Sequence, residues 1–106
     1  MVQVFEMDSS KQVWEQVGQD IIGEESMNAI GYYYVKLNSP GSRVFFSSGF
    51  YGSPESIANK VFEINESQNE WTQLGKDIMM AYPHRQQKPA ISADGNRIAV
   101  SSYTLP

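Results

Sequence analysis

Apolar residues occur along this chain in short runs, and no segment has the three-to-four-residue spacing of an amphipathic helix. Runs rich in Val, Ile, Phe and Tyr that are separated by Gly, Pro, Ser, Asn and Asp are typical of β-strands joined by turns. Strands are expected at residues 2–7, 13–19, 30–37, 43–48, 60–65, 70–78, 89–93 and 97–102, with long loops at 22–28, 49–55 and 79–88. The pattern therefore predicts an all-β, antiparallel protein.

One eight-residue pattern occurs twice. Residues 14–21 read Trp-Glu-Gln-Val-Gly-Gln-Asp-Ile and residues 71–78 read Trp-Thr-Gln-Leu-Gly-Lys-Asp-Ile, at an offset of 57 residues (71 − 14). Residues 37–48 are echoed by residues 91–102 at an offset of 54 (91 − 37), so one loop is shorter by three residues. A period of this length that holds four strands is close to the blade repeat of β-propellers.

The run at 92–100, Ser-Ala-Asp-Gly-Asn-Arg-Ile-Ala-Val, resembles the S-x-D-G-x-R-I-A-V hairpin of WD-like and TolB-like β-propeller blades. The tryptophan segment resembles the W-x-Q-x-G-x-D-I strand of tandem propeller repeats. The resemblance covers residues 2–102, and it implies that the S-x-D-G strand is innermost and the tryptophan strand outermost. Residues 38–41, Asn-Ser-Pro-Gly, depart from the motif, which indicates that this copy has drifted and leaves its turn geometry open.

Carried over to the chain, the resemblance implies one repeat region, 1–106. Residues 30–78 would form a full four-stranded blade, residues 1–21 the outer half of the preceding blade, and residues 89–102 the inner half of the following one. Known propellers use about four to eight blades, so further blades must come from a longer chain or from other copies. Another all-β fold, such as a sandwich, is the remaining alternative. The residues expected to serve the repeat structurally are Trp14, Gly18, Asp20, Trp71, Gly75, Asp77, Asp94 and Gly95.

The charge and the residue types narrow the function classes. A formal net charge of −4 disfavours nucleic acid or an anionic membrane surface as the partner. No apolar stretch approaches the ~20 residues of a membrane-spanning helix. The chain has no cysteine and a single histidine, His84, so it lacks the ligand set of a zinc site. No metal or cofactor is expected.

The candidate binding residues are aromatic and basic side chains in two of the expected long loops. Side chains of these types anchor protein and carbohydrate sites. The candidates are Phe50, Tyr51, Tyr82, His84 and Arg85. We expect a non-catalytic repeat module for scaffolding, or for recognition of protein or glycan through loops on one face. The alternative is a fragment of a propeller-based enzyme whose catalytic residues lie mostly in other blades.

Overall fold

The computed structural model describes residues 1–22, 34–50, 53–79 and 88–101. Within these ranges every regular element is a strand, and every strand pairing is antiparallel, so the all-β antiparallel class is confirmed. The strands are β1 Val2–Asp8, β2 Val13–Ile21, β3 Val35–Leu37, β4 Arg43–Phe50, β5 Ser53–Asn65, β6 Glu70–Gln73, β7 Ala90–Ile91 and β8 Ile98–Ala99. The described residues contain no helix that could cross a membrane.

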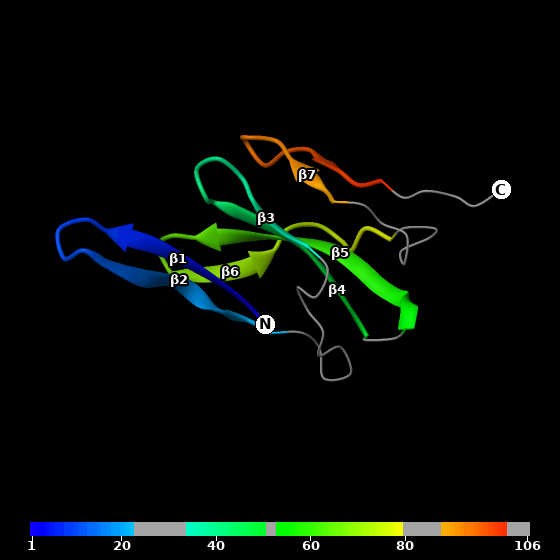
Figure 1. The fold of residues 1–106 in the computed structure, drawn as a ribbon, viewed down its shortest axis with the longest axis horizontal. Helices are drawn as coiled ribbons and strands as arrows, with labels where there is room; N and C mark the ends of the chain where they lie inside the picture. Colours follow the sequence, from blue (N-terminus) through cyan, green and yellow to red (C-terminus); the bar gives the residue numbers. More distant parts are fainter. Residues whose placement is uncertain (23–33, 51–52, 80–87, 102–106) are drawn as a thin grey trace.

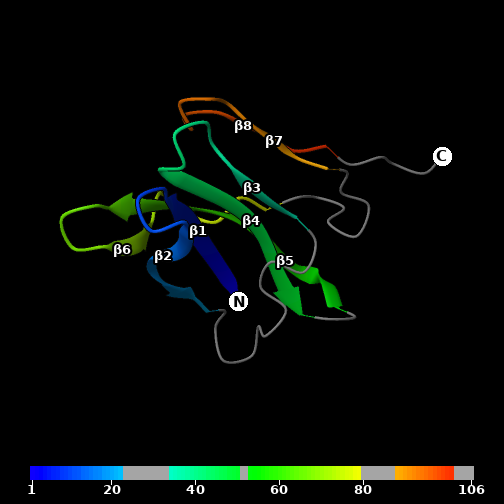
Figure 2. The same ribbon diagram turned by 60° about the vertical axis from the view of Figure 1, so that its left-hand side comes forward.

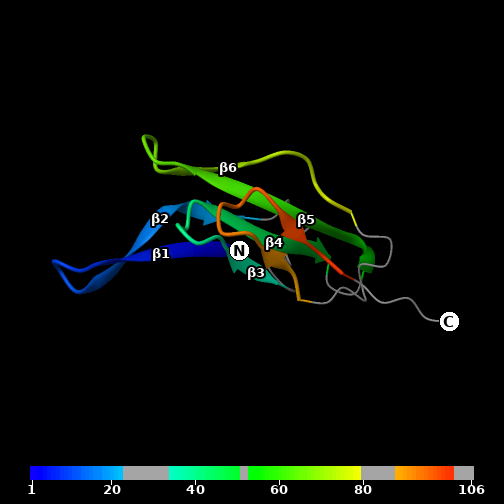
Figure 3. The same cartoon turned by 90° about the horizontal axis from the view of Figure 1, so that it is seen from above.

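A four-stranded sheet forms the centre of the molecule. Its strands follow chain order, β3-β4-β5-β6, with β6 at one edge (Figure 3). All four strands lie between residues 30 and 78, the range for which the sequence predicts a four-stranded unit. The hairpins β1–β2 and β7–β8 lie on opposite sides of this sheet (Figure 1).

Strand β4 is covered on both of its faces. Val44, Phe45 and Phe46 are all fully buried, and successive side chains of a strand point to opposite faces. On one face, Val44 and Phe46 join a core cluster with Val2 and Val4 of β1. The apolar runs in the sequence therefore mark a strand with neighbours on two sides, as expected when a sheet lies inside a stack.

Loop 49–55 was predicted wrongly. Strand β4 continues to Phe50 and β5 begins at Ser53, and these two residues pair with each other. Pro54 follows directly, although proline lacks the N–H that a regular ladder needs. The register shifts between Ser48 and Phe50, so Pro54 lies at an irregular end of the sheet, where proline is tolerated.

Strands β2 and β6 share one irregularity. In the first hairpin, Val2 pairs with Ile21 but Val4 pairs with Val17, so β2 holds two extra residues between these pairs. The predicted strand 70–78 is interrupted in the same way. It leaves the ladder after Gln73 and returns at Ile78, which forms a bridge with Asn59. Each bulge contains a glycine with positive φ, a conformation that costs glycine little.

The backbone carries the repeat as clearly as the sequence does. Every described residue with positive φ has a counterpart at one of the two repeat offsets. The pairs are Gln12 and Asn69, Gly18 and Gly75 (both 57 apart), and Gly41 and Gly95 (54 apart), with φ values of 57° and 52°, 71° and 77°, and 76° and 76°. Left-handed backbone is unfavourable for a residue with a side chain. The sharing of such positions therefore indicates that the units are built alike.

The turn of the drifted copy keeps the geometry of the other turn. The Gly41 amide donates to the carbonyl oxygen of Asn38 at 3.0 Å, and the Gly95 amide donates to that of Ser92 at 2.9 Å. The Arg43 amide donates to the Asn38 side-chain oxygen at 2.8 Å, as the amide of Arg97 donates to the Ser92 hydroxyl at 3.0 Å. The Asn38 side chain thus accepts the same backbone hydrogen bond in the first turn that the Ser92 hydroxyl accepts in the second. The open question about the first turn is resolved in favour of one shared geometry.

Candidate functional site

The first interface between sheets joins β2 of the first hairpin to β6 of the four-stranded sheet, and the two strands lie side by side (Figure 2). The Trp71 side chain is 2% exposed, and its indole Nε1 donates to the Val17 carbonyl oxygen at 2.7 Å. A Cβ placed on Gly18 would lie 2.4 Å from Cδ1 of the indole. The indole therefore rests on the glycine of the preceding bulge, and only glycine leaves room for it.

Side chains complete this interface by capping backbone groups. The Gln19 side chain accepts from the Trp71 amide at 2.8 Å and donates to the Trp71 carbonyl oxygen at 2.9 Å. The Gly18 amide donates to the Asn69 side-chain oxygen at 2.9 Å. An edge strand exposes unpaired N–H and C=O groups that invite pairing. Here the side-chain amide of Gln19 pairs with both the backbone N–H and the backbone C=O of Trp71, and it thereby fixes the relative position of β2 and β6.

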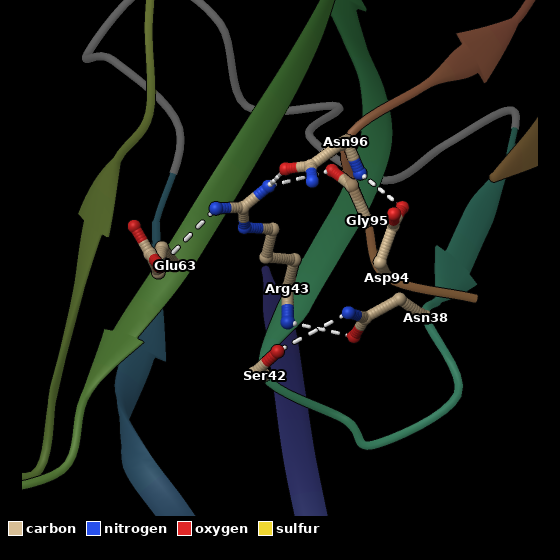
Figure 4. Close-up of polar contacts among 7 residues, drawn as sticks. All are labelled: Asn38, Ser42, Arg43, Glu63, Asp94, Gly95 and Asn96. Atoms are coloured by element: carbon tan, nitrogen blue, oxygen red, sulfur yellow. Dashed lines mark hydrogen bonds and ion pairs between the residues drawn. The ribbon is translucent and has the colours of Figure 1, made fainter. Parts of the chain in front are cut away.

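The second interface joins the four-stranded sheet to the β7–β8 hairpin (Figure 4). The Arg43 guanidinium donates through Nη1 to the Gly95 carbonyl oxygen at 2.8 Å and to the Asn96 side-chain oxygen. Its Nη2 lies 3.4 Å from a carboxylate oxygen of Glu63. The Arg43 side chain also fills the space that a Cβ on Gly95 would need, since its Cδ is 2.7 Å away. The glycine of each contact thus receives a large side chain from another unit.

The repeated aspartates bind within their own units. The Asp20 carboxylate accepts hydrogen bonds from the side-chain amides of Gln3 at 2.9 Å and Gln16 at 2.7 Å. These two hydrogen bonds lower the pKa of the Asp20 carboxyl. Asp77 accepts from side chains at the equivalent positions, Lys60 at 2.7 and 2.8 Å and Gln73 at 2.7 Å. These contacts hold each aspartate to side chains of its own unit.

The pKa values of Asp77 and Asp94 are both lowered, by different balances of burial and hydrogen bonding. Burial is the largest influence on Asp77 and raises its pKa, but the hydrogen bonds from Lys60 and Gln73 outweigh burial, so the pKa is lowered. The Asp94 carboxylate accepts from the Asn96 amide at 2.9 Å and from the Ser92 hydroxyl at 2.8 Å, and both bonds lower its pKa. The described residues contain no group of three or more metal-ligating side chains.

The predicted binding residues gain no structural support. Tyr51, Tyr82, His84 and Arg85 lie outside the described residues. Phe50 is the last residue of β4, and its side chain also lies outside the described part. These five residues therefore stay predictions from the sequence.

The structure adds three residues that the sequence reasoning did not single out, namely Gln19, Arg43 and Asn69. A signal existed for Arg43, because Arg97 stands at the same position of the other hairpin. Asn69 corresponds to Gln12 at the offset of 57, but side-chain identity is lost there and only the positive φ is shared. Gln19 corresponds to Lys76, so its role as a two-way cap was hidden.

No protein-family model, no curated protein and no solved structure matches this chain. The interpretation of its function rests on its own repeat and on the contacts between its units.

Proposed function

We propose that this chain is a non-catalytic repeat module of the propeller-blade type, which serves as a scaffold and recognises protein or glycan through loops on one face. The observation that carries the scaffold is the seating of Trp71 on Gly18. This contact packs one unit on the next through residues that recur at the repeat offset. A surface that stacks equivalent units is what a repeat scaffold needs, since each repeat is stabilised mainly by its neighbours.

The polar side chains that hold strands and turns together also favour a scaffold. The Asp20, Asp77 and Asp94 carboxylates accept hydrogen bonds from nearby side chains and backbone amides. Arg43 ties two sheets together. Groups engaged in this way hold strands and turns in place, and recognition is then left to the loops between strands, where binding residues commonly lie.

The recognition part is tested with a glycan array and a displayed-peptide library. Any ligand found is then titrated against Tyr51→Ala, Tyr82→Ala and the double variant. We expect binding to weaken by at least about 30-fold in the double variant, the loss produced by removing an interface anchor of 2 kcal/mol. Val35→Ala, at an exposed position of β3, is the control. Unchanged affinity with an unchanged melting curve would remove these loops from the binding surface.

A further inference from the structure

The β1–β2 hairpin is the repeat counterpart of β5–β6, yet its outward side is bare. Phe5, Met7 and Trp14 are exposed, and Trp14 is 66% exposed. Their counterparts 57 residues later are Phe62, Ile64 and Trp71, which pack in the core cluster against the preceding hairpin. Met7 pairs with Trp14 as Ile64 pairs with Trp71, so the two sets share one arrangement. The hairpin therefore exposes an apolar surface whose repeat counterpart is covered by the outer strands of a neighbouring unit.

The matching receptor surface lies on β5 and on the segment that follows β6. Val61, Leu74 and Ile78 are the counterparts of Val4, Val17 and Ile21. They line an open hollow of about 370 Å³ together with Ile98 of β8.

The receptor surface differs from the completed interface in its exposure. Ile78 is 39% exposed, whereas its counterpart Ile21 is 3% exposed. Gly75 has the same positive φ as Gly18, and no atom of the described residues lies within 4 Å of its would-be Cβ. The place that Trp71 occupies over Gly18 is therefore open over Gly75.

We propose that the chain self-associates head to tail, with the β1–β2 hairpin of one copy seated on the Gly75 surface of another copy. Trp14 of the arriving hairpin takes over Gly75 the position that Trp71 takes over Gly18. This inference rests on the observed packing of units and does not depend on recognition through the loops.

The edges of the two copies also match in register and charge. In the four-stranded sheet, Arg43 pairs with Glu63, and their side chains form an ion pair. The repeat counterparts are Arg97 and Glu6, both exposed in the single chain. Pairing of β8 with β1 of the arriving copy brings these two residues opposite each other. The added hairpin completes a second four-stranded unit, so each copy contributes two units.

An interface of this kind joins two different surfaces, and such contacts close into rings or continue as filaments. If the ring has about four to eight units, as propellers do, it contains about two to four copies. Sedimentation velocity over a concentration series should therefore reveal a discrete oligomer of that size. A monomer at every concentration would overturn the proposal.

Point variants show whether the proposed surfaces make the contact. Trp14→Ala and Gly75→Asn should each weaken self-association by at least about 30-fold, the effect of losing a central anchor. Asparagine tolerates positive φ, so Gly75→Asn fills the receptor without breaking the bulge. Val13→Ala is the matched control on the same hairpin, because Glu70, the counterpart of Val13, stays exposed beside the completed interface. An oligomer that persists in both variants would contradict the proposal.

A mixing experiment gives the sharpest test. The Trp14→Ala chain keeps an intact receptor and the Gly75→Asn chain keeps an intact hairpin, so the two monomeric variants should form a one-to-one dimer and nothing larger. The charge exchange Glu6→Arg with Arg97→Glu should likewise restore association that either change alone weakens. Melting curves of the dilute variants verify that each one is folded. Absence of the mixed dimer between folded variants would refute a head-to-tail interface.

Discussion

The Arg43 guanidinium donates to the Gly95 carbonyl oxygen at 2.8 Å, and the Arg43 Cδ occupies the space that a Cβ on Gly95 would need, across 52 residues of sequence. Arg43 begins β4 of the central sheet, whereas Gly95 lies in the turn of the β7–β8 hairpin. The two strands of that hairpin are only two residues long each. The Arg43 side chain attaches the last hairpin to the sheet, together with the backbone hydrogen bond from the Ser39 amide to the Ala93 carbonyl oxygen at 3.1 Å.

Replacing Arg43 by alanine should detach this hairpin locally. A hydrogen bond made by a charged group contributes about 1.5–3 kcal/mol, and loss of the packed stem adds to the effect. Hydrogen exchange of the Ser92 and Gly95 amides should accelerate accordingly. At dilute, monomeric concentration Arg97→Ala is the control, because Arg97 is exposed in the single chain. Equal acceleration in both variants would show that Arg43 is not the anchor.

The two bulge glycines should differ in their tolerance of alanine. Positive φ costs an L-residue about 1–2 kcal/mol, so Gly75→Ala should lower the free energy of unfolding by about that amount. Gly18→Ala has the same backbone cost plus a Cβ placed 2.4 Å from the Trp71 ring, which overpacks the interface. Overpacking adds about 1–3 kcal/mol. Urea unfolding at dilute, monomeric concentration measures the free energy of unfolding of both variants. Equal losses would show that the Trp71 ring moves aside at little cost.

The two tryptophans should also differ in how much they contribute to the free energy of unfolding. Truncating buried Trp71 to alanine should cost about 3–5 kcal/mol, since it empties a packed site. Truncating exposed Trp14 should change the free energy of unfolding of the dilute monomer by about 0.5 kcal/mol or less. Thermal and urea unfolding of both variants checks the contrast. A large loss with Trp14→Ala at monomeric concentration would mean that the hairpin packs within its own chain.

Stability should fall in acid. The pKa values of Asp20 and Asp77 lie below the ordinary value of ~3.9 in the folded chain. Below that ordinary value the unfolded chain binds protons first, so the stabilisation is complete above about pH 4 and is lost as pH falls through the folded pKa values. Urea midpoints at decreasing pH should show this decline, and Asp20→Asn with Asp77→Asn should flatten it. An equally steep decline in the double variant would assign the effect to other groups.

The sequence predicted the fold class because strand patterns and repeats are local signals. The tryptophan segments, the bulge glycines and the aspartates Asp20 and Asp77 could be singled out because each occurs twice at an offset of 57 residues. The contrast between Trp14 and Trp71 could not be read locally, since it depends on whether a neighbouring unit covers the ring. The end of β4 was missed because proline and glycine around residue 52 are typical of a loop, while pairing across the sheet extends the strand to Phe50.

The interface caps escaped prediction for a related reason. Gln19 uses an amide that donates and accepts at once, and no pattern of polarity marks such a residue. Asn69 and Gln12 share a backbone conformation but no side-chain identity. Their equivalence became visible only through φ, which no propensity scale would have assigned to a glutamine.

The left-handed positions can help to detect homologues whose side chains have diverged. In each unit a left-handed residue stands six positions before the bulge glycine (12 and 18, 69 and 75), and the turn glycine follows after 23 or 20 positions (41 − 18 and 95 − 75). This spacing reflects backbone sterics rather than surface chemistry. A chain that has lost both tryptophans but keeps glycines at this spacing would still be built on the same unit.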